Sequence, residues 1–126
     1  MLTNAKPICF VLTADIDRSR SFYSDPLGLT ETGADPYAVS YDLAGTMLRL
    51  TKVEGHTASP HTVLGWQVGD IAATIDALAA RSVAFAVYEG FGQDPRGVWT
   101  DPGSGTQIAW FHDPEGNNLS LTQIGG

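Results

Sequence analysis

One arginine stands where its side chain could do chemistry. Arg49 lies within the predicted strand 47–53, where alternation places it on the face opposite Leu48 and Leu50. A guanidinium that is removed from water without a partner is costly, so Arg49 requires an anion nearby. Two kinds of partner are open: a carboxylate, phosphate or enolate of a bound ligand, or an Asp or Glu of the chain itself.

Tryptophans form a second group of candidate binding residues. Trp66 alternates with apolar residues and is expected in the core. Trp99 follows a segment with Gly and Pro, so it could stack on a ligand, close over it, or pack its own loop. Trp110 shares a strand face with His112, and alternation alone does not decide whether this face points inward. The residues expected to contact a ligand are Phe10, Tyr41, Met47, Arg49, Gln67, Trp99, Trp110 and Ser120.

The titratable residues show no recognisable catalytic arrangement. The segment Asp113-Pro114-Glu115-Gly116 holds two carboxylates, but it is also typical of a hairpin turn, which is the interpretation we adopt. His56, His61 and His112 share neither a helical spacing nor a strand face, as ligands of one metal ion would. We therefore expect no metal at the histidines and assign no catalytic residue.

The elements that would position these residues occur twice. GTMLRLTKVEG (45–55) recurs seventy-one residues later as GNNLSLTQIGG (116–126), with five of eleven positions identical. Upstream, ICFVLTADI (8–16) recurs after fifty-five residues as VLGWQVGDI (63–71). In both copies an apolar strand leads into an Asp-Ile pair that begins a helix. The difference between the two offsets predicts an insertion in the second copy, between residues 88 and 105.

Each copy is expected to fold as a strand, a helix and three strands. Asp15 and Asp70 are the predicted helix N-caps, and the helices should end near Asp25 and Arg81. The predicted strands are 8–13, 29–33, 38–43 and 47–53 in the first copy, then a strand from 63, 83–88, 106–112 and 118–124 in the second.

These elements predict an α+β fold of one domain with two βαβββ modules, at about 1–55 and 60–126. The Leu faces of the repeated strands should pack against the helices. The mixed polar faces of two curved, mainly antiparallel sheets would then enclose a cleft. A cleft of this kind suits a binding protein.

Composition restricts the partners. The 126 residues include fourteen acidic and seven basic side chains, for a net charge of −7, which disfavours a nucleic-acid partner. No segment approaches the roughly twenty apolar residues of a membrane span, and the first residues do not resemble a secretory signal. The one cysteine, Cys9, cannot form an intrachain disulfide and fits a reducing compartment. We expect a cytoplasmic protein with no membrane partner.

Two motifs are similar to those of a known family. ADIDRS (14–19) followed by FY (22–23) and LGL (27–29), together with FHDPEGN (111–117), resembles the vicinal oxygen chelate superfamily. This superfamily includes glyoxalase I, extradiol dioxygenases, fosfomycin-resistance enzymes and bleomycin-resistance proteins. The resemblance covers nearly the whole chain and implies the two-module fold and a homodimer. Because one scaffold serves many activities, it does not fix the function.

The resemblance also implies where a divalent metal would bind. Enzymes of the family hold the ion with His and Glu side chains, one from each of four strands. The corresponding residues here are Ile8, Arg49, Val63 and Ser120. Aliphatic side chains have no donor atom, and a guanidinium stays protonated with no lone pair to offer. We therefore expect no metal and no cofactor.

The expected function is metal-independent binding of a small organic molecule, with sequestration of an aromatic or antibiotic-like ligand as in bleomycin-resistance proteins. The acidity suits a cationic planar ligand, whereas Arg49 favours an anionic group. One alternative is an enzyme, either a glyoxalase-like lyase or isomerase or a protein like the extradiol dioxygenases. A second is a dimeric regulatory module with a vestigial cleft.

Overall fold

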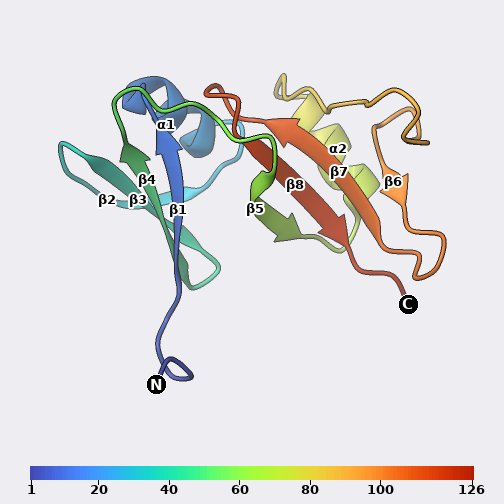
Figure 1. Ribbon diagram of the computed structural model, residues 1–126, viewed down its shortest axis with the longest axis horizontal. Helices are drawn as coiled ribbons and strands as arrows, with labels where there is room; N and C mark the ends of the chain where they lie inside the picture. Colours follow the sequence, from blue (N-terminus) through green and yellow to red (C-terminus); the bar gives the residue numbers. More distant parts are fainter. The chain divides into compact units, whose positions relative to one another are not determined.

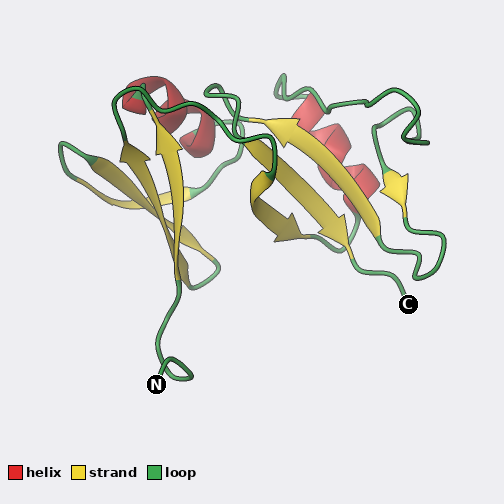
Figure 2. Ribbon diagram, viewed as in Figure 1, coloured by secondary structure: helices red, strands yellow, loops and turns green.

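The computed structural model describes all 126 residues, which form two compact units, Met1–Ala58 and Ser59–Gly126 (Figure 1). Each unit contains one helix and one four-stranded mixed sheet (Figure 2). The α+β class and the strand, helix and three-strand order of each copy are confirmed. Neither helix has the length and apolar character that a membrane crossing requires.

The first unit is built on a sheet of strand order β1-β4-β3-β2. β1 runs parallel to β4, and the other neighbouring strands are antiparallel. Asp15 caps the helix as predicted, because its side chain accepts the amide of Arg18 at 3.1 Å. The elements are β1 (Ile8–Thr13), α1 (Ile16–Ser24), β2 (Thr30–Ala34), β3 (Ala38–Leu43) and β4 (Thr46–Lys52).

One face of this sheet is covered by α1. Leu48 and Leu50 of β4 are fully buried there, and the rings of Tyr23 from α1 and Tyr41 from β3 lie 6.3 Å apart. The other face, which we call the helix-free face of the sheet, carries three rows of cross-strand neighbours. The rows are Ile8, Met47 and Asp42; Phe10, Arg49 and Ser40; and Leu12, Thr51 and Ala38.

The second unit repeats this plan with the strand order β5-β8-β7-β6. β5 runs parallel to β8, and α2 lies behind the sheet in the view of Figure 1. Asp70 caps α2 as predicted, by accepting the amide of Ala73 at 3.0 Å. The elements are β5 (Thr62–Gln67), α2 (Ile71–Ala79), β6 (Trp99–Thr100), β7 (Gln107–His112) and β8 (Asn118–Gln123).

The core of the second unit decides the orientation of β7. Phe111 is fully buried and stacks on Trp66, with ring centroids 6.3 Å apart, so Trp66 packs against the core as expected. Ala109 and Phe111 pair with Leu121 and Leu119 on the face that α2 covers. Trp110 and His112, two residues whose orientation the sequence left open, therefore lie on the helix-free face of the second sheet.

One predicted strand, 83–88, is wrong. Only Phe85 forms a bridge, to Phe111, and the first strand after α2 is instead the two-residue β6. Ala86 donates its amide to the carbonyl of Trp110 in β7 at 2.8 Å, and a side chain takes other backbone groups of the segment. Gln93 donates its Nε2 to the carbonyl of Ala86 at 2.9 Å and accepts the amide of Tyr88 at 2.6 Å.

The turn between β7 and β8 is organised by Asp113. Its Oδ1 accepts the amides of Glu115 and Asn117, both at 2.9 Å, and its Oδ2 accepts Nδ2 of Asn117 at 2.9 Å. Asp113 is 4% exposed and Asn117 is 2% exposed. The carboxylate of Asp113 is therefore used by the hairpin turn, in agreement with the interpretation of this segment as a turn.

Candidate functional site

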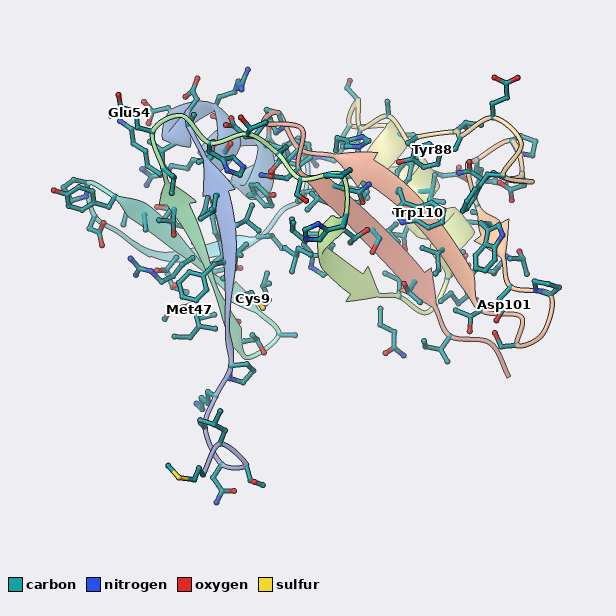
Figure 3. The ribbon with its side chains drawn as sticks, in the orientation of Figure 1. Cys9, Met47, Glu54, Tyr88, Asp101 and Trp110 are labelled. Atoms are coloured by element: carbon teal, nitrogen blue, oxygen red, sulfur yellow. The ribbon has the colours of Figure 1, made fainter.

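Four aromatic rings gather beside β7 in the second unit. Trp110 meets Tyr88 and Phe91 edge to face, with ring centroids 6.1 and 5.6 Å apart. Phe91 also lies 6.0 Å from Tyr88 and 6.1 Å from Trp99 of β6. Figure 3 labels Tyr88 and Trp110, which lie next to each other at β7. We call these four residues the aromatic cluster.

The aromatic cluster is accessible from outside the chain. Phe91 is 47% exposed and Tyr88 is 40% exposed, while Trp99 and Trp110 are half-buried. Ring pairs of this geometry contribute about 0.5–1.5 kcal/mol each beyond the burial of their surface, so the rings hold one another in place. A contiguous exposed apolar patch marks a surface that binds a ligand or a partner. The aromatic cluster is therefore the leading candidate site.

The loop that carries Tyr88 and Phe91 is held by side-chain hydrogen bonds. Gln93 bridges its two sides, because Nε2 also donates to the carbonyl of Gly97 at 2.6 Å. Asp94 accepts the amide of Val98 at 2.9 Å through Oδ1. These bonds fix a loop that is not part of any strand. The two exposed rings therefore project from a braced segment.

An ion pair connects the same loop to α2. Arg96 donates Nε and Nη2 to the two carboxylate oxygens of Asp76, both at 2.9 Å. The hydrogen bond from Arg96 lowers the pKa of Asp76 from its ordinary value. Because both side chains are about half exposed, the pair adds little to stability. Its bidentate geometry serves mainly to orient the loop.

Small and polar residues lie next to Trp110 on the helix-free face of the second sheet. Ser120 of β8 is the cross-strand neighbour of Trp110, and Gly65 of β5 is the neighbour of Ser120. A Cβ atom at position 65 would lie 2.6 Å from Oγ of Ser120, so the glycine makes room for this hydroxyl. Gln67 is exposed on the same face, two residues along β5.

In the first unit, Arg49 lies in the middle row of the helix-free face, between Phe10 and Ser40. Its Nη2 is 3.8 Å from Oδ2 of Asp35, with the side chains 34% and 50% exposed. This separation is too long for a hydrogen bond. The internal partner considered from the sequence therefore exists, but it engages the guanidinium only as a long ion pair.

Asp35 is bound more closely to the backbone than to Arg49. Its Oδ1 accepts the amide of Tyr37 at 2.8 Å and that of Ala38 at 3.0 Å. The amide of Tyr37 contributes most to holding the pKa of Asp35 below its ordinary value, and Arg49 contributes less. The carboxylate of Asp35 therefore interacts more strongly with the turn before β3 than with Arg49.

An open hollow of about 430 Å³ lies at one end of the first sheet. It includes Ile8, Met47 and Asp42, which form the row next to that of Arg49. Ile8 and Met47 are 47% and 42% exposed, so the hollow has an apolar wall. The full lining is Lys6, Pro7, Ile8, Thr32, Tyr41, Asp42, Gly45 and Met47.

The eight predicted contact residues divide between the two sheets. Phe10, Met47 and Arg49 lie on the helix-free face of the first sheet. Gln67, Trp99, Trp110 and Ser120 lie on that of the second.

Tyr41 is the exception among these eight. It pairs with Leu48 on the helix-covered face and, although it borders the hollow, has no exposed surface. Its hydroxyl lies 2.9 Å from Oγ of Ser24 and donates to the carbonyl of Arg20 at 3.2 Å. Burial raises the pKa of Tyr41. The expectation that Tyr41 faces outward with Met47 and Arg49 is corrected by this register.

Tyr88 and Phe91 were not among the predicted contacts. Both fall in the segment 88–105 that has no equivalent in the first copy. The signal that could have found them is Phe91 between Gly90 and Gly92, since both glycines have positive φ, 75° and 74°. A large ring between two such glycines sits on a turn, where it cannot be buried by strand or helix packing.

The donor chemistry at the four positions that the resemblance assigns to a metal does not fit a divalent ion. Ile8 and Arg49 lie on the helix-free face of the first sheet, and Ser120 lies on that of the second. Val63 falls at an irregularity in the pairing of β5. Two of these side chains have no donor atom, one is a cation, and one is a neutral hydroxyl. The chain contains no group of three or more His, Cys, Asp or Glu side chains placed to hold a metal ion.

A family model described as "Glyoxalase/Bleomycin resistance protein/Dioxygenase superfamily" matches residues 7–121. No curated protein matches the chain. Among solved structures, a member of that superfamily from Sphaerobacter thermophilus DSM 20745 is 22% identical, with a TM-score of 0.74 over 98% of this chain and 99% of that one.

Two further solved structures are proteins named for antibiotics. TnmS3, an antibiotic binding protein from Streptomyces sp. CB03234, is 21% identical, with a TM-score of 0.71 over 98% of each chain. The fosfomycin resistance protein FosX from Listeria monocytogenes is 9% identical, with a TM-score of 0.72 over 95% of this chain and 93% of that one. At these identities the likeness establishes the fold.

Proposed function

We propose, from the premise that this chain belongs to the glyoxalase/bleomycin resistance protein/dioxygenase superfamily, that it binds a small organic molecule with a flat aromatic body and needs no metal ion to do so. The observation that carries the proposal is the aromatic cluster. Four rings from a braced loop, β6 and β7 meet at an accessible surface. A flat ligand would bury apolar area there and gain ring contacts.

The chemistry of the helix-free faces supports independence from metal. Arg49 and Ser120 stand where the family resemblance calls for anionic ligands, and a guanidinium repels a divalent cation. Ile8 and Val63 offer no lone pair. Affinity would then come from ring stacking, apolar burial and hydrogen bonds to polar side chains, as in ordinary small-molecule sites.

One of the similar structures supports a role in binding an antibiotic, and a second supports a role in antibiotic resistance. TnmS3 is an antibiotic binding protein and FosX is a fosfomycin resistance protein, so this fold serves antibiotic-related functions in proteins of similar length. We propose that the present chain likewise holds an aromatic or antibiotic-like molecule. By the same resemblance we propose a homodimer, and the single free Cys9 is in keeping with a cytoplasmic location.

A thermal-shift comparison of three flat compounds tests the proposal. The cation proflavine, the neutral 2-naphthamide and the anion 2-naphthoate are all flat aromatic compounds and carry different charges, and at least one should raise the melting temperature. A ligand at one hundred times its dissociation constant adds about 2.7 kcal/mol of stability. Stabilisation by Zn²⁺ or Ni²⁺ alone, together with turnover of a thiol hemiacetal or a catechol, would replace the proposal with the enzyme alternative. A stable dimer that responds to none of the compounds would favour the regulatory module.

A further inference from the structure

We propose that Arg49 is the centre of a carboxylate-binding subsite on the helix-free face of the first sheet, and that Asp35 occupies it as an internal carboxylate until a ligand displaces it. The inference rests on the proposed function for the presence of a small organic ligand. It adds the chemical class of ligand that the first sheet would take, which is an aromatic or other flat apolar carboxylate.

The guanidinium of Arg49 lies between an aromatic side chain and a hydroxyl side chain. Phe10, Arg49 and Ser40 are direct neighbours on three adjacent strands, whose axes are about 4.8 Å apart, and all three side chains leave the sheet on the same face. Phe10 is 58% exposed, so its ring is accessible to a flat ligand. The hydroxyl of Ser40 can donate a further hydrogen bond to an anion held by Arg49.

Asp35 leaves hydrogen-bond donors of Arg49 unused. A guanidinium has five N–H donors and binds a carboxylate most strongly through two parallel hydrogen bonds. Asp35 cannot form this pair, because its Oδ1 already accepts the amides of Tyr37 and Ala38 and its Oδ2 is 3.8 Å from Nη2 of Arg49. The donors of Arg49 therefore exceed what the chain supplies to them.

Displacement of Asp35 from Arg49 would leave the turn before β3 intact. The contacts of Asp35 with the two amides do not depend on Arg49, so a ligand carboxylate can take the guanidinium while the turn before β3 keeps its hydrogen bonds. Asp35 then acts as a competitor. Its negative charge lowers the affinity of Arg49 for any added anion.

The exposed apolar surface beside Arg49 favours an organic carboxylate over a small inorganic anion. Ile8 and Met47, in the next row of the same face, are 47% and 42% exposed and form the apolar wall of the hollow of about 430 Å³. An inorganic anion would leave this surface and the ring of Phe10 in water. A carboxylate on a flat apolar body covers both.

A titration with 2-naphthoate and 2-naphthamide tests the subsite, because the two compounds have the same shape and differ in charge. Binding is followed by ¹⁵N NMR at the amides of Phe10 and Ser40. We expect 2-naphthoate to bind about tenfold more tightly at these amides, since a charge-assisted pair is stronger than a neutral hydrogen bond. Arg49→Gln should abolish that preference while keeping an amide donor at the position.

Asp35→Asn is the matched variant, and it should change the affinity for 2-naphthoate in the opposite direction. The asparagine keeps Oδ1 for the two amides of the turn and removes the competing charge, so 2-naphthoate should bind several-fold more tightly than to the original chain. A merely structural ion pair predicts the reverse: both variants would melt at lower temperature and neither would change the preference for the carboxylate. That result would overturn the proposal.

The remaining outcomes separate this inference from the proposed function. Equal shifts by both compounds at Trp110, with none at Phe10 or Ser40, would refute the carboxylate subsite and leave the aromatic-ligand proposal standing. Shifts by 2-naphthoate at Phe10 and Ser40 alone would confirm the subsite and count against the aromatic cluster. The absence of shifts at all these positions would refute both.

Discussion

Trp110→Ala is expected to weaken the binding of 2-naphthamide about tenfold or more, because buried aromatic contacts of this kind supply 1–2 kcal/mol or more at a binding site. Trp110 is the member of the aromatic cluster that the sheet itself positions, and it contacts both exposed rings of the loop. The measurement is an NMR titration followed at the indole N–H signal of Trp99, which remains in the variant. The neutral ligand keeps the result independent of Arg49.

Trp66→Phe is the matched control for this prediction. Trp66 is also half-buried, but it stacks on Phe111 at the helix-covered face. The substitution should lower stability and leave the affinity for 2-naphthamide unchanged. If Trp110→Ala bound 2-naphthamide as tightly as the original chain, the aromatic cluster would be loop packing and the site would have to be sought elsewhere.

Asp113→Ala is expected to lower the free energy of unfolding by about 2–4 kcal/mol, the range for removing a buried, multiply hydrogen-bonded carboxylate. Three donors from Glu115 and Asn117 would lose their acceptor in a place where Asp113 is 4% exposed and water has little access. Urea denaturation followed by circular dichroism measures the change.

Asp101→Ala supplies the comparison for that substitution. Asp101 also organises a turn, since it accepts the amide of Gly103 at 3.1 Å and the hydroxyl of Ser104 at 2.6 Å. Its turn is exposed, so water can replace the lost acceptor and the cost should stay below about 1 kcal/mol. Equal losses for the two variants would show that burial does not strengthen the Asp113 turn.

Much of the fold followed from local signals that each copy of the repeat carries by itself. Asp15 and Asp70 were recognisable as helix N-caps because capping depends on a side chain and an amide three residues away. The alternation of Leu119 and Leu121 with polar residues likewise gave the helix-covered face of β8 without knowledge of its neighbours, although Ser120 on the other face is also buried.

The errors arose where a residue outside the segment decided its structure. The segment 83–88 has strand-like composition, but Gln93 takes the carbonyl of Ala86 and the amide of Tyr88. The outward assignment of Tyr41 failed because its face depends on its pairing with Leu48 in a neighbouring strand. The periodicity of one segment predicts neither the hydrogen bonds of Gln93 nor the strand partner of Tyr41.

The candidate site was only half predictable for the same reason. Trp99 and Trp110 drew notice as large aromatic residues, and the structure places both on the helix-free face of the second sheet. Tyr88 and Phe91 join them through the path of a loop braced by Gln93 and by the ion pair of Arg96 with Asp76. No regular spacing in the sequence brings these four rings together.

Ligand binding by this chain is proposed to need no metal ion. The most direct measurement is calorimetric titration of the tightest-binding of the three flat compounds into protein that has been treated with a chelator, repeated after addition of one equivalent of Zn²⁺, Ni²⁺ or Mn²⁺. Metal-independent binding predicts the same dissociation constant in every titration. Binding that disappears on removal of metal and returns with one of these ions would contradict it.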